Sequence, residues 1–418
     1  MAFTQSHPLP LAAVRALALY AQRLTASNNA DSVPTLDTIY DTVVQLGCLQ
    51  VDTLHMVRRS HYVTLWSRLG GLVPADLDRL IYDPEHRRLF EYWMHAASII
   101  PLCNYRYRLP MMDHHRESGG WWPDWIKKPE NQAVVRHVRE RIQTEGALRS
   151  ADFKHDGAKR GSWWDWKPSK HALEYLYNVG EVMIAERVNF QRVYNLRERV
   201  LPKWIDMTPP TDDDTDRFVI ERAARALGIG AAGHIADYAY RKRGTAAPVI
   251  KALVAEGVLV EVEGEVHGGD TATLITHRDH LPALEQAADG AIVPQRTTFL
   301  NPFDSLFWPR DRDQQVWGFR QTLEAYRKAE DRIWGYYCLP ILHHDRLVGR
   351  FDPKLDRKTS TLILRALYLE PGIVPDEALI ADVAATMRDF MAWHEATDLV
   401  IEKSDPAAFG EKLLAAAL

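Results

Sequence analysis

The sequence predicts an α+β protein in which tandem winged-helix (helix-turn-helix) units precede a β-rich, partly barrel-like C-terminal domain. Two stretches of the chain contain helical runs that end in a pair of strands, and the pattern after about residue 295 is mostly strand. A chain of 418 residues is also too long for one hydrophobic core. We therefore expect several domains in series.

The first segment, about residues 1–145, is predicted to consist mainly of helices with short connections. Apolar residues recur at helical spacing over Leu9–Leu24, and Thr35 precedes a second helical run that reaches Leu46. Further helices are expected over residues 62–69 and 90–98.

The second segment, about residues 146–210, has the order of helix and then hairpin that is typical of a winged helix. Pro168 can begin a helix that Gly180 ends. Strands over 181–185 and 190–194 then form a hairpin.

The third segment, about residues 211–292, repeats this order after an acidic stretch suited to a helix N-terminus. The expected helices are 218–227, 231–240 and 246–256, and the expected strands are 258–266 and 272–275. Gly228–Gly233 matches the glycine-rich dinucleotide pattern letter for letter. It follows a helical run and not a strand, so we predict a turn between helices and no dinucleotide fold.

The last segment, 293–418, is predicted to be a small β-rich domain closed by a helix. Its expected strands are 298–300, 334–342, 346–351 and 361–369, and its expected helix is 376–396.

Composition places the chain among globular proteins, with 46% hydrophobic and 26% charged residues. The net charge of −5 is uneven, because residues 1–210 hold 27 Lys+Arg against 23 Asp+Glu and the remainder is acidic. This asymmetry permits phosphate contacts before residue 210, but the charge alone leaves nucleic-acid binding open. No apolar run is long enough to cross a bilayer, so we expect a soluble, cytoplasmic protein.

The three cysteines, Cys48, Cys103 and Cys338, lie far apart without a Cys-x-x-Cys pair. This spacing gives no support for a disulfide framework, a zinc ribbon or an iron–sulfur cluster, and we expect buried thiols. Signatures of P-loop nucleotide hydrolysis, serine hydrolases and zinc enzymes are also absent.

The clearest candidate for chemistry is a polar pair beside an apolar run, Gln50 and Asp52. On an extended strand the two side chains share one face. An ionised carboxylate can stabilise a sugar cation or accept a proton from water, and an amide can orient that water. Spacing alone also fits a simpler interpretation, namely a capped strand end with a solvated aspartate.

Other side chains are candidates for binding DNA or lining the site. Glu91, His95 and Ser98 would share one stripe of the predicted helix over 90–98, where His95 could donate to a phosphate. Basic or polar candidates near the pair or near tryptophan clusters are Arg58, Arg59, His61, Lys167 and Lys170. The tryptophans themselves, at 121, 122, 125, 163, 164 and 166, could stack on bases or pack between helix and wing.

Short matches in the same order along nearly the whole chain resemble the winged-helix DNA glycosylases of the YcaQ (AlkX) and AlkZ type. The matching stretches are Leu46–Asp52, Arg59–His61, Leu65–Gly70, Glu91–Trp93, His95–Ser98, Gly180–Val182, Tyr194–Leu196, Glu198–Pro202, Asn301–Asp304, Tyr336–Leu342 and Gly349–Lys354. The resemblance implies three tandem winged helices, with the first over residues 1–145.

The resemblance also implies hydrolysis of the N-glycosidic bond of alkylated purines in double-stranded DNA, with Gln50 and Asp52 as the catalytic pair. Aspartate at the second position is similar to the crosslink-unhooking YcaQ branch. Alkylation at guanine N7 makes the base a good leaving group, so a carboxylate and an oriented water suffice. We therefore expect a monofunctional enzyme without cofactor or metal. We also expect a monomer whose DNA contacts concentrate before residue 210 and that is associated with the nucleoid when it is bound to DNA.

Two alternatives remain open from the sequence. A non-enzymatic winged-helix transcriptional regulator would bind operator DNA without releasing a base. An interaction scaffold would bind proteins through the same units, and would fail to bind any duplex at low salt.

Overall fold

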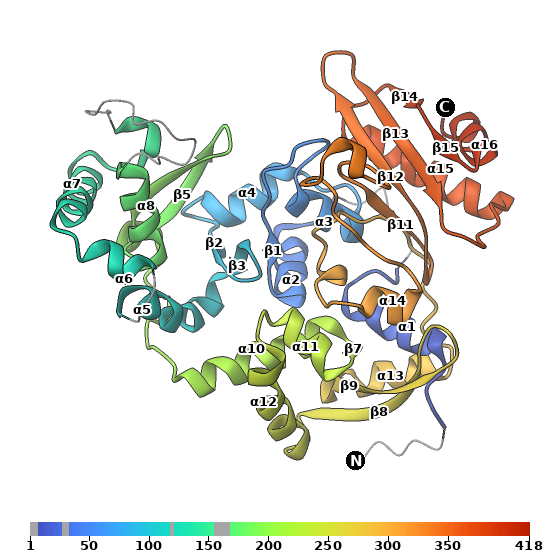
Figure 1. The fold of residues 1–418 in the computed structure, drawn as a ribbon, viewed down its shortest axis with the longest axis horizontal. Coiled ribbons are helices and arrows are strands. Elements are labelled where there is room, and N and C mark those ends of the chain that lie inside the picture. Colours follow the sequence, from blue (N-terminus) through green and yellow to red (C-terminus); the bar gives the residue numbers. More distant parts are fainter. Residues whose placement is uncertain (1–6, 27–32, 118–120, 154–167) are drawn as a thin grey trace. The chain divides into compact units, whose positions relative to one another are not determined.

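The computed structural model describes residues 7–26, 33–117, 121–153 and 168–418 (Figure 1). The chain divides into two compact units. The first unit comprises residues 1–77, 93–98 and 216–418, and the second comprises residues 78–92 and 99–215.

The N-terminal elements are mostly the helices that the sequence predicts. They are α1 (Leu11–Ala21), α2 (Leu36–Leu46), β1 (Leu49–Gln50), α3 (Ser60–Leu69) and α4 (Pro74–Tyr82). Thr35 caps α2 through its side-chain oxygen, which accepts a hydrogen bond from the backbone N–H of Thr38 at 3.2 Å. Gly47 ends the helix with φ of +84°.

The predicted helix over 90–98 is wrong, because this stretch forms a hairpin of β2 (Leu89–Trp93) and β3 (Ala97–Pro101). The N–H of Met94 donates to the carbonyl of Ala96 at 2.9 Å across the turn. Aromatic and β-branched residues fill both strands, which favours extended backbone over helix. The helical stripe predicted for Glu91, His95 and Ser98 therefore does not exist.

The second unit continues with helices and a three-stranded sheet in the order β4-β6-β5. Its elements are η1 (Leu102–Arg108), α5 (Leu109–Glu117), α6 (Trp121–Ile126), α7 (Pro129–Glu145), β4 (Leu148–Arg149), η2 (Ser150–Asp152), α8 (Pro168–Asn178), β5 (Val182–Val188), β6 (Gln191–Leu196) and α9 (Arg197–Val200). The predicted hairpin is confirmed, with Val188 opposite Gln191 at its turn.

The first unit resumes with further helices and the sheet β7-β9-β8. These elements are α10 (Asp212–Leu227), β7 (Ile229–Gly230), α11 (Ala232–Tyr238), α12 (Arg243–Ala255), β8 (Leu259–Glu265), β9 (Thr271–His277), η3 (Arg278–His280) and α13 (Leu281–Ala288). Gly228 lies in the predicted turn with φ of +78°, and a Cβ there would come within 2.8 Å of the Leu17 carbonyl oxygen. The glycine-rich stretch is therefore a close-packed turn.

The C-terminal part is a curled, half-barrel sheet in the order β10-β11-β12-β13-β14, with β15 also paired to β13. Its elements are β10 (Thr297–Phe299), η4 (Ser305–Phe307), α14 (Arg312–Trp317), η5 (Ala329–Asp331), β11 (Leu339–His343), β12 (Arg346–Asp356), β13 (Thr361–Leu369), α15 (Glu377–Trp393), β14 (Asp398–Ile401), β15 (Ser404–Asp405) and α16 (Ala407–Ala417). The strand predicted over 334–342 begins only at Leu339.

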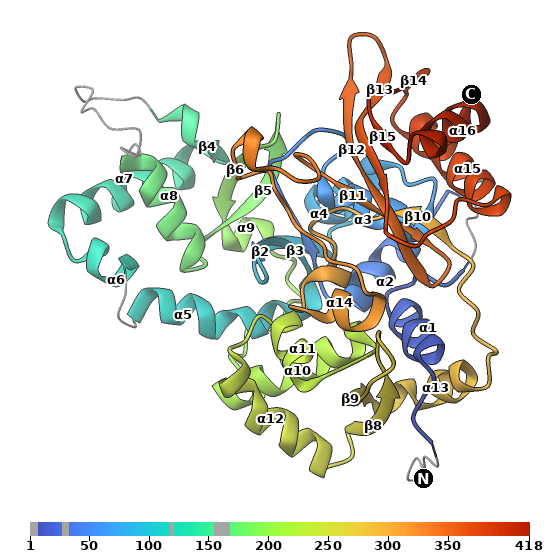
Figure 2. The same ribbon diagram turned by 45° about the vertical axis from the view of Figure 1, so that its right-hand side comes forward.

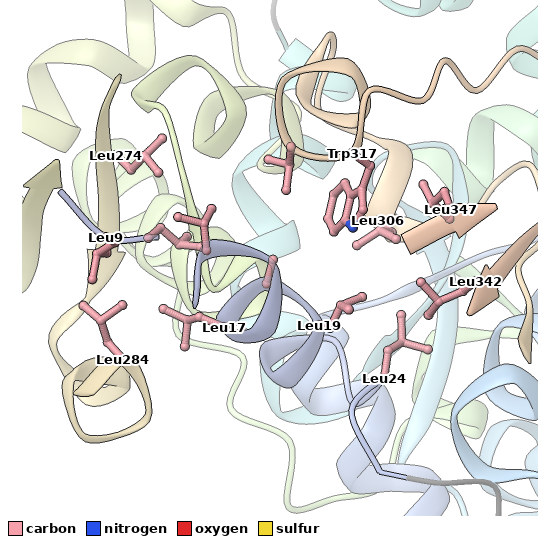
Figure 3. Packing of buried hydrophobic residues seen from close by; sticks show 14 of the residues in the cluster. Leu9, Leu17, Leu19, Leu24, Leu274, Leu284, Leu306, Trp317, Leu342 and Leu347 are labelled. Atoms are coloured by element: carbon pink, nitrogen blue, oxygen red, sulfur yellow. The ribbon is translucent and has the colours of Figure 1, made fainter. Parts of the chain in front are cut away.

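The core of the first unit joins the N-terminal helix to the C-terminal sheet. Helix α1 lies beside α13 and α14 (Figure 2). Its Leu17 and Leu19 converge with Leu284 of α13, Trp317 of α14 and Leu342 of β11 (Figure 3). Burial of these side chains contributes roughly 1.5–3 kcal/mol each relative to exposure.

In the described part of the chain, no helix is long and apolar enough to cross a membrane. Cys48 and Cys338 are buried as expected, but Cys103 is exposed on η1.

Candidate active site

The predicted alternation around the polar pair is confirmed. Leu49 and Val51 are buried, whereas Gln50 and Asp52 are both half-buried. The N–H of Val51 donates to the carbonyl of Ala97 at 2.8 Å, which extends the pairing of β1 toward the start of β3. Gln50 and Asp52 consequently share one side of an extended backbone.

Two hydrogen bonds hold this segment at either end. The hydroxyl of Ser60, the first residue of α3, donates to the carbonyl of Gln50 at 2.9 Å. The Asp52 carboxylate accepts the N–H of Leu54 through Oδ1 at 2.8 Å. This second bond is the capped strand end that spacing alone suggested. It fixes one carboxylate oxygen and leaves Oδ2 outside the turn.

The charge of Asp52 reaches two phenols of the C-terminal half of the chain. Burial raises the pKa of Tyr337 far above its usual value, and the Asp52 carboxylate raises it further. The same two causes raise the pKa of Tyr326, whose side chain is 78% exposed. Two tyrosines from one loop therefore lie within electrostatic range of this carboxylate.

The backbone before β1 is packed against an arginine. A Cβ at Gly47 would overlap the guanidinium of Arg222 from α10. The same guanidinium donates to Sδ of Met94 in the β2–β3 turn at 3.3 Å. Arg222 thus links the start of the candidate strand to the hairpin beside it.

His95 lies at the tip of the β2–β3 hairpin. Its ring stacks on Trp308 and meets the edge of Tyr240, with centroid distances of 4.5 and 5.3 Å. Burial lowers the pKa of His95 to about 4, although the charge of Asp237 opposes this shift. The imidazole is therefore neutral at physiological pH, and any contact with a phosphate would be made without a positive charge.

A second link ties α3 to the segment before α14. Arg68 forms a bidentate ion pair with Asp304, and neither side chain is exposed. Nearby, the Asn301 amide donates to Oγ1 of Thr64 at 2.6 Å and to the carbonyl of Ser60 at 3.3 Å. Two predicted family stretches that lie far apart in sequence are thus in direct contact.

Residues 43–393 match the protein family described as DNA glycosylase AlkZ-like. The chain belongs to this family. Its fold is similar to that of Streptomyces sahachiroi DNA glycosylase AlkZ, with a TM-score of 0.61 and 15% sequence identity. The similarity covers 95% of the present chain and 100% of the Streptomyces chain. Family membership makes the protein a DNA N-glycosylase, an enzyme of DNA repair.

Glu91 and Ser98 of this glycosylase occupy buried positions. Glu91 is 3% exposed, and its two carboxylate oxygens accept hydrogen bonds from Arg187 at 2.8 and 2.6 Å and from Tyr82 at 2.6 Å. Burial alone would raise the pKa of Glu91, but the bonds to Arg187 lower it overall. Ser98 donates to the carbonyl of Ala96 at 3.0 Å. Both positions favour a structural role.

The basic candidates after Asp52 contact protein groups. Arg58 donates twice to the carbonyl of Trp393, at 3.0 and 2.8 Å, and lies over its ring. Arg59 donates to the carbonyl of Thr53 at 2.7 Å. His61 is buried and packs on Tyr62. Their use in binding DNA stays a prediction.

Lys170 is half-buried in the first turn of α8. Lys167 lies outside the described residues, as do the tryptophans at 163, 164 and 166. Trp121, Trp122 and Trp125 pack against one another and against His171 and Tyr175 of α8. Packing between helices therefore accounts for the cluster of Trp121, Trp122 and Trp125.

Among the described residues, one group could hold a metal ion. Ligand atoms of His343, His344 and Asp382 lie within 4.8 Å of one another where the β11–β12 turn meets α15. The expectation that the glycosylase reaction needs no metal stays a prediction.

Sequence reasoning gave no role to Tyr326 or Tyr337, although Tyr337 lies in one of the matching stretches. Nothing in their spacing relates them to Asp52, because the two segments are separated by most of the chain. The one signal at this position is the pair of aromatic residues Tyr336 and Tyr337 near the start of a predicted strand.

Proposed function

We propose that this glycosylase removes alkylated purines of the N7-alkylguanine class from double-stranded DNA, including nitrogen-mustard-type interstrand crosslinks. The observation that carries the proposal is the shared face of Gln50 and Asp52. One carboxylate with a fixed Oδ1 stands beside one amide in a chain of this family. Aspartate at the second position supports the YcaQ-like branch.

In the proposed reaction the alkylated base is itself a good leaving group. A purine alkylated at N7 is cationic, so the bond from C1′ to N9 can break without a general acid. Charge then develops on the deoxyribose, and the Asp52 carboxylate stabilises it. Water forms the new bond to C1′, its proton goes to Asp52, and the neutral alkylated purine and an abasic site remain.

Gln50 is the proposed water-orienting residue. Its amide offers two donors and an acceptor, so it can hold the nucleophile while Asp52 takes the proton. The chemistry requires no lysine nucleophile, and we infer a monofunctional enzyme. No covalent enzyme–DNA adduct should be trapped with borohydride, and such an adduct would contradict this inference.

The wider assignment rests on the same family. We infer that the helix and hairpin elements act as three winged-helix modules, 1–145, 146–210 and 211–292, followed by the β-rich domain 293–418. We also infer a monomer that acts in the cytoplasm on duplex DNA, near the nucleoid. The regulator and scaffold alternatives lose support because the chain belongs to an enzyme family.

The decisive experiment uses a duplex with a single N7-methylguanine and follows abasic sites by alkaline strand cleavage. Wild-type protein should release the base, and Asp52→Asn should reduce the single-turnover rate about 10²–10³-fold with duplex binding retained. Gln50→Leu should cost about 10–10²-fold. Intact strands with wild-type protein, or full activity in Asp52→Asn, would contradict the proposal. The same assay on a mustard-crosslinked duplex tests crosslink unhooking.

A further inference from the structure

The loop that carries Tyr326 and Tyr337 joins α14 to β11 and contains only the short helix η5. A long loop in a compact domain is typically functional. Residues 319–338 also hold the phenols that lie within electrostatic range of Asp52.

Two buried carboxylates fix the end of this loop. Glu324 accepts the backbone N–H groups of Ile333, Trp334 and Gly335 at 3.0, 2.8 and 3.3 Å. The N–H groups of the next two residues donate to Asp352 of β12 at 2.8 and 2.9 Å. Residues 333–337 therefore donate to side-chain carboxylates and not to a neighbouring strand, which is why β11 begins late.

Gly335 is required at the centre of this arrangement. A Cβ at this position would lie 2.6–2.7 Å from atoms of the Asp352 side chain, closer than real contacts allow. The backbone thus passes directly over the carboxylate that holds Tyr336 and Tyr337. The position of the Tyr337 ring is set by its own main chain, and the ring has little freedom to move.

The hydroxyl of Tyr337 has no visible use within the protein. The residue is 1% exposed, and its Oη is buried without a hydrogen-bond partner among the described residues. Leaving a buried hydroxyl unpaired costs free energy, so such a group in a folded protein points to a partner that binds there, such as water or substrate.

A chain of contacts connects this phenol to the candidate pair. The Tyr337 ring lies against Phe303, with centroids 6.3 Å apart. The N–H of Phe303 donates to the Asn301 side chain at 2.8 Å, and the Asn301 amide reaches Ser60, which bonds to the Gln50 carbonyl. Tyr337 is thus connected to the strand that carries Gln50 through Phe303, Asn301 and Ser60.

We propose that Tyr337 is a positioning residue of the active site, whose buried hydroxyl holds the nucleophilic water beside Asp52. This inference rests on the proposed function of Asp52 and Gln50. A water molecule has two donors and two lone pairs. It would donate to Asp52 and to the side-chain amide oxygen of Gln50, and accept from Tyr337, so that one lone pair remains for C1′. The elevated pKa keeps the phenol protonated and able to donate at neutral pH.

The test removes only the oxygen, with Tyr337→Phe. We expect the single-turnover excision rate at saturating enzyme to fall about 10-fold or more, with the dissociation constant for duplex DNA changed less than about twofold. The melting temperature should not fall, because no hydrogen bond within the protein is lost. The matched control is Tyr92→Phe in the second unit. Its hydroxyl donates to the Asn178 carbonyl, so this change should lower the melting temperature and leave the excision rate unchanged.

A second readout reports on the water itself. In buffer with methanol, methanol and water compete for C1′, and the product is methyl deoxyriboside or the abasic site. If Tyr337 holds the water, Tyr337→Phe should raise the methyl product relative to wild type. An unchanged rate together with an unchanged product ratio would overturn the inference. The proposed function would stand in that case as long as Asp52→Asn is inactive, and would fall separately if wild-type protein released no base.

Discussion

His95 and Trp308 lie face to face, with ring centroids 4.5 Å apart and ring planes 8° apart. The Trp308 indole N–H in turn donates to the Phe303 carbonyl at 3.0 Å. Because Phe303 also contacts Tyr337, the tip of the β2–β3 hairpin is connected to the loop near Asp52. The neutral imidazole is therefore placed to pack and not to act as a charge.

This stacking predicts a distinction between two substitutions at His95. His95→Phe preserves a flat ring on Trp308, so we expect the excision rate to stay within about threefold of wild type. His95→Ala removes the ring and should lower the rate at least about 10-fold through a mobile hairpin tip. Single-turnover kinetics on the N7-methylguanine duplex measure both. An equal loss in the two variants would instead indicate that an imidazole N–H contacts the DNA.

The buried Arg68–Asp304 pair predicts a large effect on stability. Arg68→Met leaves the Asp304 carboxylate buried without its partner, and should cost about 3–5 kcal/mol of unfolding free energy. The double variant Arg68→Met with Asp304→Leu removes both charges and should recover part of this loss. Urea unfolding at pH 7 measures the unfolding free energy of wild type, of Arg68→Met and of the double variant. A double variant less stable than Arg68→Met would contradict the explanation.

His394 predicts sensitivity to acid. Burial lowers the pKa of His394 to about 3, and its Nε2 accepts the N–H of Arg58 at 3.0 Å. Because the unfolded chain binds the proton near pH 6.5, stability is complete above that pH and is lost as the pH falls toward 3. At pH 5 this residue alone should cost about 2 kcal/mol. Urea unfolding of wild type and His394→Gln at pH 7 and pH 5 should show a smaller pH effect in the variant.

Glu91 also predicts a loss of stability in acid, although it is an acidic group and His394 is a basic one. Its pKa is lowered in the folded state by Arg187 against the effect of burial, so its contribution is present above the unfolded pKa and is lost as the pH falls through the folded value. Glu91→Gln should therefore destabilise the second unit at pH 7 by about 3 kcal/mol and have less effect at pH 3. Proteolysis and urea unfolding at both pH values check this. Equal destabilisation at both pH values would contradict a contribution from the charge of Glu91.

Local patterns account for the elements that the sequence predicts correctly. The Thr35 cap, the hairpin over 181–194 and the alternation at Gln50 and Asp52 depend on neighbours in the chain. The helix predicted over 90–98 failed because its turn, Met94–Ala96, lacks the glycine, asparagine or proline that signals a hairpin. Spacing of i, i+4 and i+7 then matched a helix by coincidence.

The sequence identifies only part of the candidate site. Gln50 lies on β1 and Asp52 two residues further along the chain, so a local pattern can reveal them. Tyr337 lies within electrostatic range of Asp52, on a loop whose end is held by Glu324 and Asp352, and no local signal encodes that path. Side-chain carboxylates that replace a strand partner are set by tertiary packing, which periodicity does not report.

The ion pair between Arg68 and Asp304 also has a consequence during translation. Helix α3 follows β1 and Asp52 early in the chain, yet the carboxylate that neutralises Arg68 is synthesised more than two hundred residues later. Asp352, which fixes Tyr337, leaves the ribosome later still. A nascent or prematurely terminated chain therefore holds the candidate pair, Gln50 and Asp52, without these supports. We expect base excision to begin only once nearly the entire polypeptide has been released.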